Sequence, residues 1–300
     1  MPPSAPDARS PFRALTDDGV LLCGEWIVPP DPVGVAVTLH AMMVNRRTMD
    51  RPAGGGLASA LAARGLAVAN VDFRGHGESA MEGAPTYDDF VVHDIPAVVA
   101  AARAPFPGLR VAIVGHSLGG HTTLLLAGLL PHRAPDALVM LASNLWLRRT
   151  EPSALRRAQK GAALAVWLAV ARTFGSFDAP RFRFGSERAS LALVEQFHTF
   201  FATDALRSRD GTIDYDAALG RAALPVLSIS SEGDSLLAHP AAARAFAELA
   251  PRAHCTHRVI RHGELGGPAP DHMGLVTSPA SRPVWDDVAR WLVGLASTKA

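Results

Sequence analysis

Val111-Ala112-Ile113-Val114-Gly115-His116-Ser117-Leu118-Gly119 is the stretch of sequence that decides the fold. Its first four residues form an apolar run typical of a buried strand, and residues Thr122 to Leu130 have the pattern of a helix. Between them lies a Gly-x-Ser-x-Gly motif, whose small residues permit the sharp strand-to-helix turn that exposes a nucleophilic serine. The motif alone often arises by chance. Its place between a strand and a helix is what predicts that Ser117 is a nucleophile.

Short apolar strands alternate with helical patterns on both sides of this stretch. Such a rhythm is typical of βαβ units, and it predicts an α/β fold with a mostly parallel central sheet and helices on both faces. Ahead of these units, Asp17-Asp18-Gly19 separates two apolar runs and predicts an antiparallel hairpin. The predicted strands are 13–16, 20–27, 35–39, 67–71, 110–114, 137–141, 225–230 and 256–260, and the predicted helices are 56–64, one ending near 103, 118–130 and 284–295.

The strand rhythm stops between residues 144 and 222, where the pattern is helical. We therefore predict a core formed by residues 13–143 and 223–300, a helical cap at 144–222, and a flexible N-terminus at 1–12. Aromatic residues in the cap would either favour apolar acyl or alkyl groups or simply form the core of the cap. These residues are Trp146, Trp167, Phe174, Phe197 and Phe201.

Composition excludes several classes of partner. The 300 residues include 29 basic and 28 acidic side chains with no block of like charge, so nothing indicates nucleic acid as a partner. The most apolar stretch, 162–171, is about half of the roughly 20 residues that a membrane span needs. Two cysteines, Cys23 and Cys255, make no metal-binding or disulfide pattern and are expected to be buried thiols. The N-terminus does not resemble a secretory signal, so a cytoplasmic location is expected.

A second motif carries a family resemblance. Asp72-Phe73-Arg74-Gly75-His76-Gly77-Glu78-Ser79 resembles the Arg-Gly-x-Gly-x-Ser loop of the α/β-hydrolase superfamily, and the likeness extends from about Leu21 to the C-terminal helix. Within the superfamily the chain is most similar to bacterial serine esterases and lipases. Ser117 excludes the members whose nucleophile is aspartate or cysteine. The resemblance implies the α/β-hydrolase fold and a catalytic triad in the chain order serine, acid, histidine.

The acid and the histidine of that triad have two candidates each. Family order places the acid just after strand 225–230, where Asp234 is the first choice and Glu232 the alternative. The histidine should follow the last strand, where His272 is preferred to His262. A serine hydroxyl needs such an imidazole to take its proton, and the imidazole in turn needs a carboxylate to orient it.

An oxyanion hole requires two backbone amides directed at the ester carbonyl oxygen. The amide of Leu118 is one candidate, and the resemblance implies that the loop after strand 35–39 supplies the other through Met42. In that loop Ala41 stands where the family usually has glycine. Three side chains beside these groups are candidates for substrate binding: His40, Met43 and His116, of which His116 could instead be packed beside the nucleophile.

The sequence thus predicts a serine hydrolase that cleaves carboxylic esters through an acyl-serine intermediate, with a small-molecule substrate and without a metal or cofactor. Two alternatives remain open. An acyltransferase would use the same residues, and a non-catalytic binding protein could keep the fold. The sequence does not indicate the oligomeric state.

Overall fold

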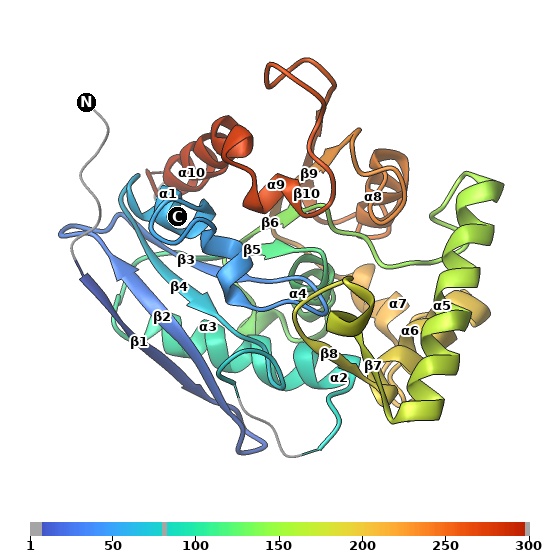
Figure 1. The fold of residues 1–300 in the computed structure, drawn as a ribbon. Helices are drawn as coiled ribbons and strands as arrows, with labels where there is room; N and C mark the ends of the chain where they lie inside the picture. The colour runs from blue at the N-terminus through green and yellow to red at the C-terminus, as the bar shows by residue number, and fades with distance from the viewer. Residues whose placement is uncertain (1–7, 80–82, 298–300) are drawn as a thin grey trace.

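The structure is a computed structural model that describes residues 8–79 and 83–297. One eight-stranded sheet has the order β1-β2-β4-β3-β5-β6-β9-β10 (Figure 1). β1 and β2 are antiparallel to their neighbours, and the remaining pairs are parallel, as predicted. The strands are β1 (Ala8–Leu15), β2 (Leu21–Val28), β3 (Gly34–Leu39), β4 (Leu66–Val71), β5 (Val111–His116), β6 (Ala137–Leu141), β9 (Pro225–Ser231) and β10 (His254–Ile260).

Helices cover both faces of the sheet, and β3 to β6 are therefore buried along their whole length. Alternate side chains of these strands enter two separate hydrophobic cores. Helices α1 (Leu57–Ala62) and α10 (Arg282–Ser297) close one core, and α3 (Ile95–Arg103), α4 (Leu118–Leu129) and α8 (Pro240–Ala247) close the other. The predicted layers of helix, sheet and helix are confirmed.

The N-terminal hairpin is longer than the sequence predicted. β1 pairs with β2 along its full length, from Ala8 opposite Val28 to Leu15 opposite Leu21, and the side chain of Phe12 is buried. The prediction of a flexible segment at 1–12 is therefore wrong for residues 8–12, because β2 offers them a complete set of backbone partners. Residues 1–7 lie outside the described part of the chain.

The loop that carried the family resemblance joins distant parts of the core. Buried Arg74 donates through Nε to Asp94 at 2.6 Å and through its two terminal nitrogens to Asp18 at 2.6 and 2.9 Å. Ser79 Oγ accepts from the amide of Cys23 at 2.8 Å and donates to the carbonyl oxygen of Asp72 at 2.7 Å. The arginine and serine of this motif thus hold the N-terminal hairpin against the parallel part of the sheet.

Residues 142–224 connect β6 to β9 outside the sheet. Helices α5 and α6 pack together at one end of the molecule (Figure 1), and α7 packs against α4. The segment also contains a two-stranded antiparallel sheet, β7 paired with β8, that the helical pattern did not predict. Strands of three residues are too short to show a period of two. The elements are α5 (Ala154–Phe174), β7 (Ser176–Asp178), β8 (Arg188–Ser190), α6 (Leu191–Thr203) and α7 (Tyr215–Leu219), and the short helices α2 (Tyr87–Asp89) and α9 (Gly274–Thr277) lie elsewhere in the chain.

The contact between α4 and α7 depends on Gly128. A Cβ atom at this position would lie 1.7 Å from the carbonyl oxygen of Ala218, so Gly128→Ala must push the two helices apart. We expect it to lower the free energy of unfolding by about 1–3 kcal/mol, the usual cost of overpacking. Gly294→Ala in α10 is the control, since an added Cβ there meets no atom of the described residues within 4 Å apart from its own helix backbone and chain neighbours. It should raise the stability by about 0.5–1 kcal/mol. Urea denaturation measures both, and a Gly128→Ala protein as stable as the parent would contradict this packing.

Candidate active site

Ser117 occupies a strained turn between β5 and α4. Its backbone has φ 50° and ψ −106°, a conformation that residues other than glycine rarely adopt. Only glycine fits at positions 115 and 119, because a side chain at either position would clash with its neighbours. A Cβ on Gly115 would lie 2.3 Å from the backbone of Gly119, and a Cβ on Gly119 would lie 2.6 Å from Cβ of Leu39. The predicted strand, turn and helix around the serine are confirmed.

Ser117 opens into a cavity of about 380 Å³ at the carboxyl ends of the parallel strands. Loops after β3, β5, β6 and β9, the loop before α9, and parts of residues 142–224 all contribute to its wall. The lining residues are Ala41, Met42, Met43, Val44, Ser117, Leu118, His121, Asn144, Trp146, Trp167, Arg183, Phe184, Phe197, Gly233, Asp234, Ser235, Leu236, Leu237, Asp271, His272 and Met273.

Asp234 and His272 meet in this cavity. Nδ1 of His272 lies 2.6 Å from Oδ2 of Asp234, whose side chain is almost completely buried. The Asp234 carboxylate also accepts the backbone amides of Leu237 and Ala238, each at 2.9 Å. Burial opposes ionisation of Asp234, but the hydrogen bond from His272 and the two amides outweigh it and lower the pKa of this carboxyl. An ionised Asp234 holds a proton on Nδ1 and leaves Nε2 of His272 as the basic nitrogen.

The two alternative residues lie together, outside the cavity. The amide of His262 donates to Oε2 of Glu232 at 3.0 Å, and Nδ1 of His262 accepts from the amide of Ala269 at 3.1 Å. Neither side chain lines the cavity. Asp271 lines it, but its carboxylate accepts from the amide of Gly274 at 2.6 Å. The structure therefore brings Asp234 and His272 into the cavity of Ser117, and it leaves Glu232 and His262 in a neighbouring loop.

The loop after β3, which the sequence predicts to supply an oxyanion amide, lies at the wall of the cavity. Among the described residues, the backbone amides of Met42 and Leu118 donate no hydrogen bond, and both residues line the cavity. Met43 has φ 64°, and its carbonyl oxygen accepts the amides of Ser186 and Glu187, each at 2.9 Å. Segment 142–224 is thereby fixed to this loop, and Met43 lines the cavity; its role in substrate binding stays a prediction.

Two predicted substrate-binding residues, His40 and His116, do not line the cavity. His40 is fully buried. Its Nδ1 is 2.7 Å from the carbonyl oxygen of Ala41 and its Nε2 accepts from the amide of Phe73 at 3.1 Å, so it braces the loop from behind. His116 is also fully buried, and its Nε2 lies 3.0 Å from the carbonyl oxygen of His272. Burial lowers the pKa of His116 to about 3 and keeps it neutral. His116 therefore supports the backbone of His272 instead of touching substrate.

Four aromatic side chains, Trp146, Trp167, Phe184 and Phe197, form part of the remaining wall. Trp146 and Trp167 stack with ring centroids 5.6 Å apart, and Phe184 meets Trp167 edge-on at 5.2 Å. Of the five aromatic residues singled out in the sequence, Trp146, Trp167 and Phe197 line the cavity, while Phe174 is exposed and Phe201 packs near Gly161. Sequence reasoning missed several polar lining residues, of which His121 and Asn144 are buried and Arg183 and Ser235 are exposed. His121 lies in an apolar helix and Asn144 in a loop without a motif, so neither gave a signal.

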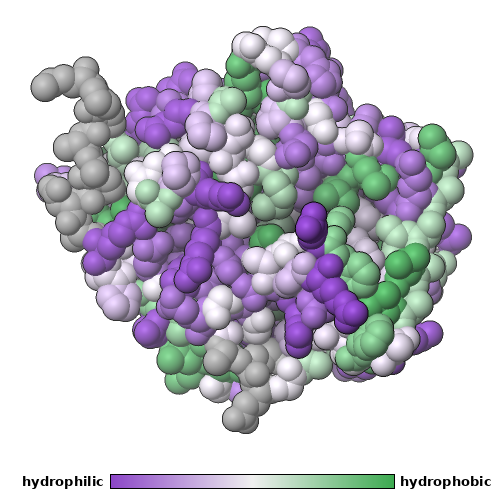
Figure 2. All heavy atoms as spheres, in the orientation of Figure 1, coloured by the Kyte–Doolittle hydropathy of each residue, from purple (hydrophilic) through white to green (hydrophobic). Residues whose placement is uncertain are grey.

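Part of the outer surface of segment 142–224 is apolar as well. Figure 2 shows hydrophobic residues gathered over α5. The large exposed apolar side chains of the segment are Leu155, Val166, Phe174, Phe182 and Phe184. Because Phe184 also lines the cavity, this apolar surface reaches the cavity's mouth. No helix in the described residues is long and apolar enough to cross a membrane.

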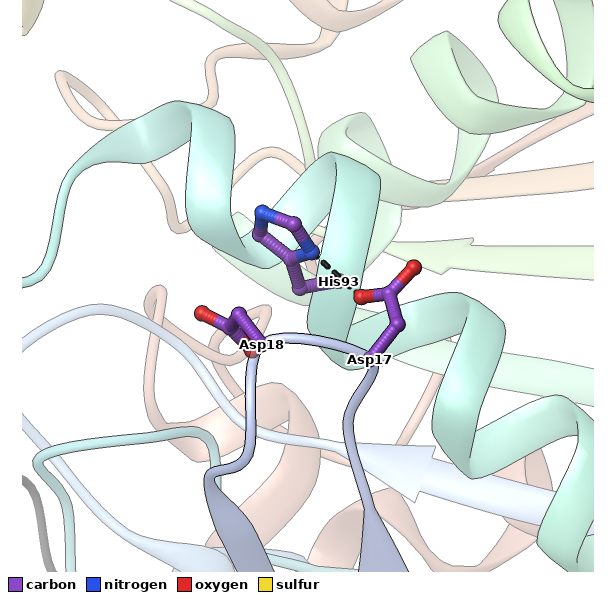
Figure 3. A group of neighbouring side chains, drawn as sticks. All are labelled: Asp17, Asp18 and His93. Atoms are coloured by element: carbon purple, nitrogen blue, oxygen red, sulfur yellow. Dashed lines mark hydrogen bonds and ion pairs between the residues drawn. The ribbon is translucent and has the colours of Figure 1, made fainter.

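One cluster elsewhere has the composition of a metal site. Asp17, Asp18 and His93 bring potential ligand atoms within 4.8 Å of one another at the turn between β1 and β2 (Figure 3). The carboxylates are already neutralised, since Asp17 contacts His93 at 2.5 Å and Arg133 at 3.2 Å and Asp18 binds Arg74. Hydrogen bonding from Arg74 also lowers the pKa of Asp18. These contacts describe an ion-pair network that fixes the hairpin.

Comparison with known proteins identifies the family. Residues 53–264, more than half of the chain, match the family described as serine aminopeptidase, S33. The chain belongs to the S33 family. The match spans Ser117 and Asp234 and ends before His272. No curated protein sequence matches this S33 chain.

Solved structures confirm that this S33 chain has the α/β-hydrolase fold. It is similar to an esterase of Pyrococcus furiosus, with 18% identity, a TM-score of 0.62, and coverage of 96% of this chain and 91% of that one. A monoacylglycerol lipase of Paleococcus ferrophilus gives 16% identity, a TM-score of 0.57 and coverage of 96% and 98%. Est1E of Butyrivibrio proteoclasticus, with ferulic acid bound, gives 16% identity, a TM-score of 0.60 and coverage of 92% and 97%.

Proposed function

We propose that this S33 hydrolase cleaves carboxylic esters through an acyl-serine intermediate, with Ser117 as nucleophile, His272 as base and acid, and Asp234 as the residue that orients His272. The observation that carries the proposal is the contact of 2.6 Å between His272 and Asp234 in the cavity onto which the strained Ser117 opens. The S33 family and the fold shared with esterases and a lipase support an ester hydrolase.

The first half of the reaction transfers the acyl group to the enzyme. Ser117 Oγ attacks the ester carbonyl carbon while Nε2 of His272 takes the hydroxyl proton. The carbonyl oxygen becomes an oxyanion, and the free amides of Met42 and Leu118 stabilise it. When the tetrahedral intermediate collapses, the bond to the alcohol oxygen breaks and His272 gives its proton to that oxygen.

The second half restores the enzyme. Water attacks the acyl carbon while His272 takes one of its protons, and collapse of the second intermediate releases the carboxylic acid and returns the proton to Ser117. Asp234 stays ionised throughout, and it stabilises the imidazolium in both halves. The steps use only groups of this chain and water.

The family description names aminopeptidases, which bind the free α-amino group of a peptide. Such a group requires an acidic partner in the cavity. Among the described lining residues the acids are Asp234 and Asp271, and both already accept hydrogen bonds from the protein. The rest of the wall is largely apolar, which suits the acyl or alkyl group of an ester. The family and the neighbours do not favour an acyltransferase or a non-catalytic binding protein.

The proposal is tested with a panel of p-nitrophenyl esters of increasing acyl length, beside matched thioesters, amides and aminoacyl anilides. We expect turnover of esters to exceed turnover of the anilides. Faster release of an N-terminal amino acid than of any ester would reject the esterase in favour of the aminopeptidase. A cytoplasmic location remains a prediction from the sequence.

We also propose that residues 144–222 act as a cap that sets acyl selectivity. Trp167 from α5 lines the cavity, whereas Phe201 from α6 packs near Gly161 and does not. Trp167→Ala should therefore change the ratio of kcat/KM for long and short acyl esters by about tenfold, since filling or emptying an apolar pocket is worth about 1–3 kcal/mol. Phe201→Ala is the matched control and should lower thermal stability without changing that ratio. Equal ratios for both variants and the parent would show that the wall is only structural.

A further inference from the structure

Two buried polar side chains interrupt the apolar wall of the cavity. His121 projects from α4, one turn after Ser117, and Asn144 follows β6. Both are at least nine-tenths buried, with exposed fractions of 2% and 5%. Neither belongs to the proposed triad or the oxyanion hole. Buried polar atoms are normally paired, so unpaired ones at a cavity indicate a ligand that completes them.

The protonation of His121 follows from its single partner. Its Nδ1 lies 2.8 Å from the hydroxyl of Tyr87, which is itself fully buried among aromatic rings. The Tyr87 hydroxyl has no other hydrogen-bond partner among the described residues, and a fully buried hydroxyl proton left unpaired is unfavourable, so the favoured arrangement is donation from this hydroxyl to Nδ1. Burial lowers the pKa of His121 to about 3 and keeps the ring neutral. The proton of the imidazole therefore sits on Nε2, and this N–H has no partner within the described chain.

Asn144 adds a second unpaired group. Its amide nitrogen and its amide oxygen are both buried, and neither has a hydrogen-bond partner among the described residues. The neighbouring Ser143 is different, because its hydroxyl donates to the carbonyl oxygen of Ser117 at 2.7 Å. An amide left unpaired in an apolar wall is unfavourable unless a ligand pairs with it.

We infer that the cavity recognises esters whose buried group carries an oxygen atom, such as an ether, hydroxyl or carbonyl oxygen. This oxygen accepts a hydrogen bond from Nε2–H of His121 and, once the buried side chain of Asn144 turns toward it, a second one from the Asn144 amide. This inference deepens the proposed function and rests on it. The aromatic wall accommodates the carbon chain, and the two polar groups select the position of the oxygen. A purely aliphatic group would bury these donors without partners and would be discriminated against.

The test uses pairs of esters that have the same chain length and differ by one oxygen. On the acyl side, p-nitrophenyl 3-methoxypropanoate is compared with p-nitrophenyl pentanoate, and 4-methoxybutanoate with hexanoate. On the alcohol side, the butanoate of 2-ethoxyethanol is compared with that of 1-pentanol. Each value of kcat/KM is divided by the rate of hydroxide-catalysed hydrolysis to remove intrinsic reactivity. We expect a preference for the oxygen-containing member of about tenfold or more in at least one series.

Variants connect that preference to the two side chains. Asn144→Leu and His121→Phe should each reduce it by about tenfold, and His121→Gln, which keeps an N–H donor, should restore part of it. Trp167→Phe alters the apolar wall and should change both members of each pair alike. Tyr87→Phe removes the partner that fixes the His121 tautomer, so it should also reduce the preference although Tyr87 does not line the cavity.

Labelling of Ser117 by a fluorophosphonate separates the possible failures. A parent protein that neither reacts with the probe nor hydrolyses any ester would reject the proposed function itself. A parent that hydrolyses esters but shows no oxygen preference in either series would overturn only the present inference. The same conclusion follows if the preference survives in Asn144→Leu and His121→Phe proteins that still react with the probe.

Discussion

Ser117→Ala is expected to lower kcat for ester hydrolysis by a factor on the order of 10⁴ to 10⁶, as removal of one member of a catalytic triad does in measured cases. The structure supplies the reason, because the strained turn directs Ser117 at the cavity that holds His272. Alanine removes the only atom that can bond to the acyl carbon. The loss should be confined to kcat, since the cavity wall that binds the substrate is unchanged.

Covalent labelling provides the second readout. A fluorophosphonate should react with the parent protein at Ser117, as shown by peptide mapping, and should not react with the Ser117→Ala protein. Ser278→Ala is a matched control, since this serine caps a short 3-10 helix outside the cavity. It should keep both labelling and turnover. Labelling that persists in Ser117→Ala would assign the nucleophile to another residue.

The sheet was predictable because burial on both faces leaves a strong pattern. Strands such as β3, β5 and β6 are buried along their whole length and almost entirely apolar, and the intervening helices recur at a spacing typical of βαβ units. The N-terminal strand was underestimated, since Ala8 to Phe12 includes Ser10 and Pro11 and shows no strict alternation. β7 and β8 were missed because three residues are too few to carry a period.

Site residues could be predicted from the sequence only where the chemistry fixes the order of serine, acid and histidine along the chain. Ser117 was predicted from the glycines around it, and Asp234 and His272 from their places after β9 and β10; all three line one cavity, and their catalytic roles stay a proposal. The wrong predictions concern the direction in which a side chain points. His40 and His116 lie beside the catalytic groups in sequence, but their side chains point into the interior, and a sequence does not show to which side of a loop or strand end a ring turns. For the same reason His121 could not be distinguished from an ordinary core residue.

Loss of His272 should be the second large effect, and it distinguishes the two histidines that follow β10. We expect His272→Ala to lower kcat for ester hydrolysis by a factor of 10² or more, the usual contribution of general acid–base catalysis. His262→Ala should retain at least about a tenth of the parent activity. The reason is geometric. His272 shares the cavity with Ser117 and contacts Asp234 at 2.6 Å, whereas His262 is exposed and accepts from the amide of Ala269.

The hydrogen bond between the backbone amide of His262 and Glu232 makes His262→Ala a close control for His272→Ala. Because the amide of His262 binds Glu232 through the backbone, His262→Ala keeps this hydrogen bond and loses the one that the imidazole accepts from the amide of Ala269. A modest loss of activity in His262→Ala would therefore reflect the missing loop contact with Ala269, whereas a loss as large as that in His272→Ala would indicate a role in the chemistry. Rates at saturating substrate, together with circular dichroism of both variants, measure the effect. If folded His272→Ala protein kept its activity while His262→Ala lost it, the base would be His262, and the hydrogen bond between His272 and Asp234 would have only a structural role.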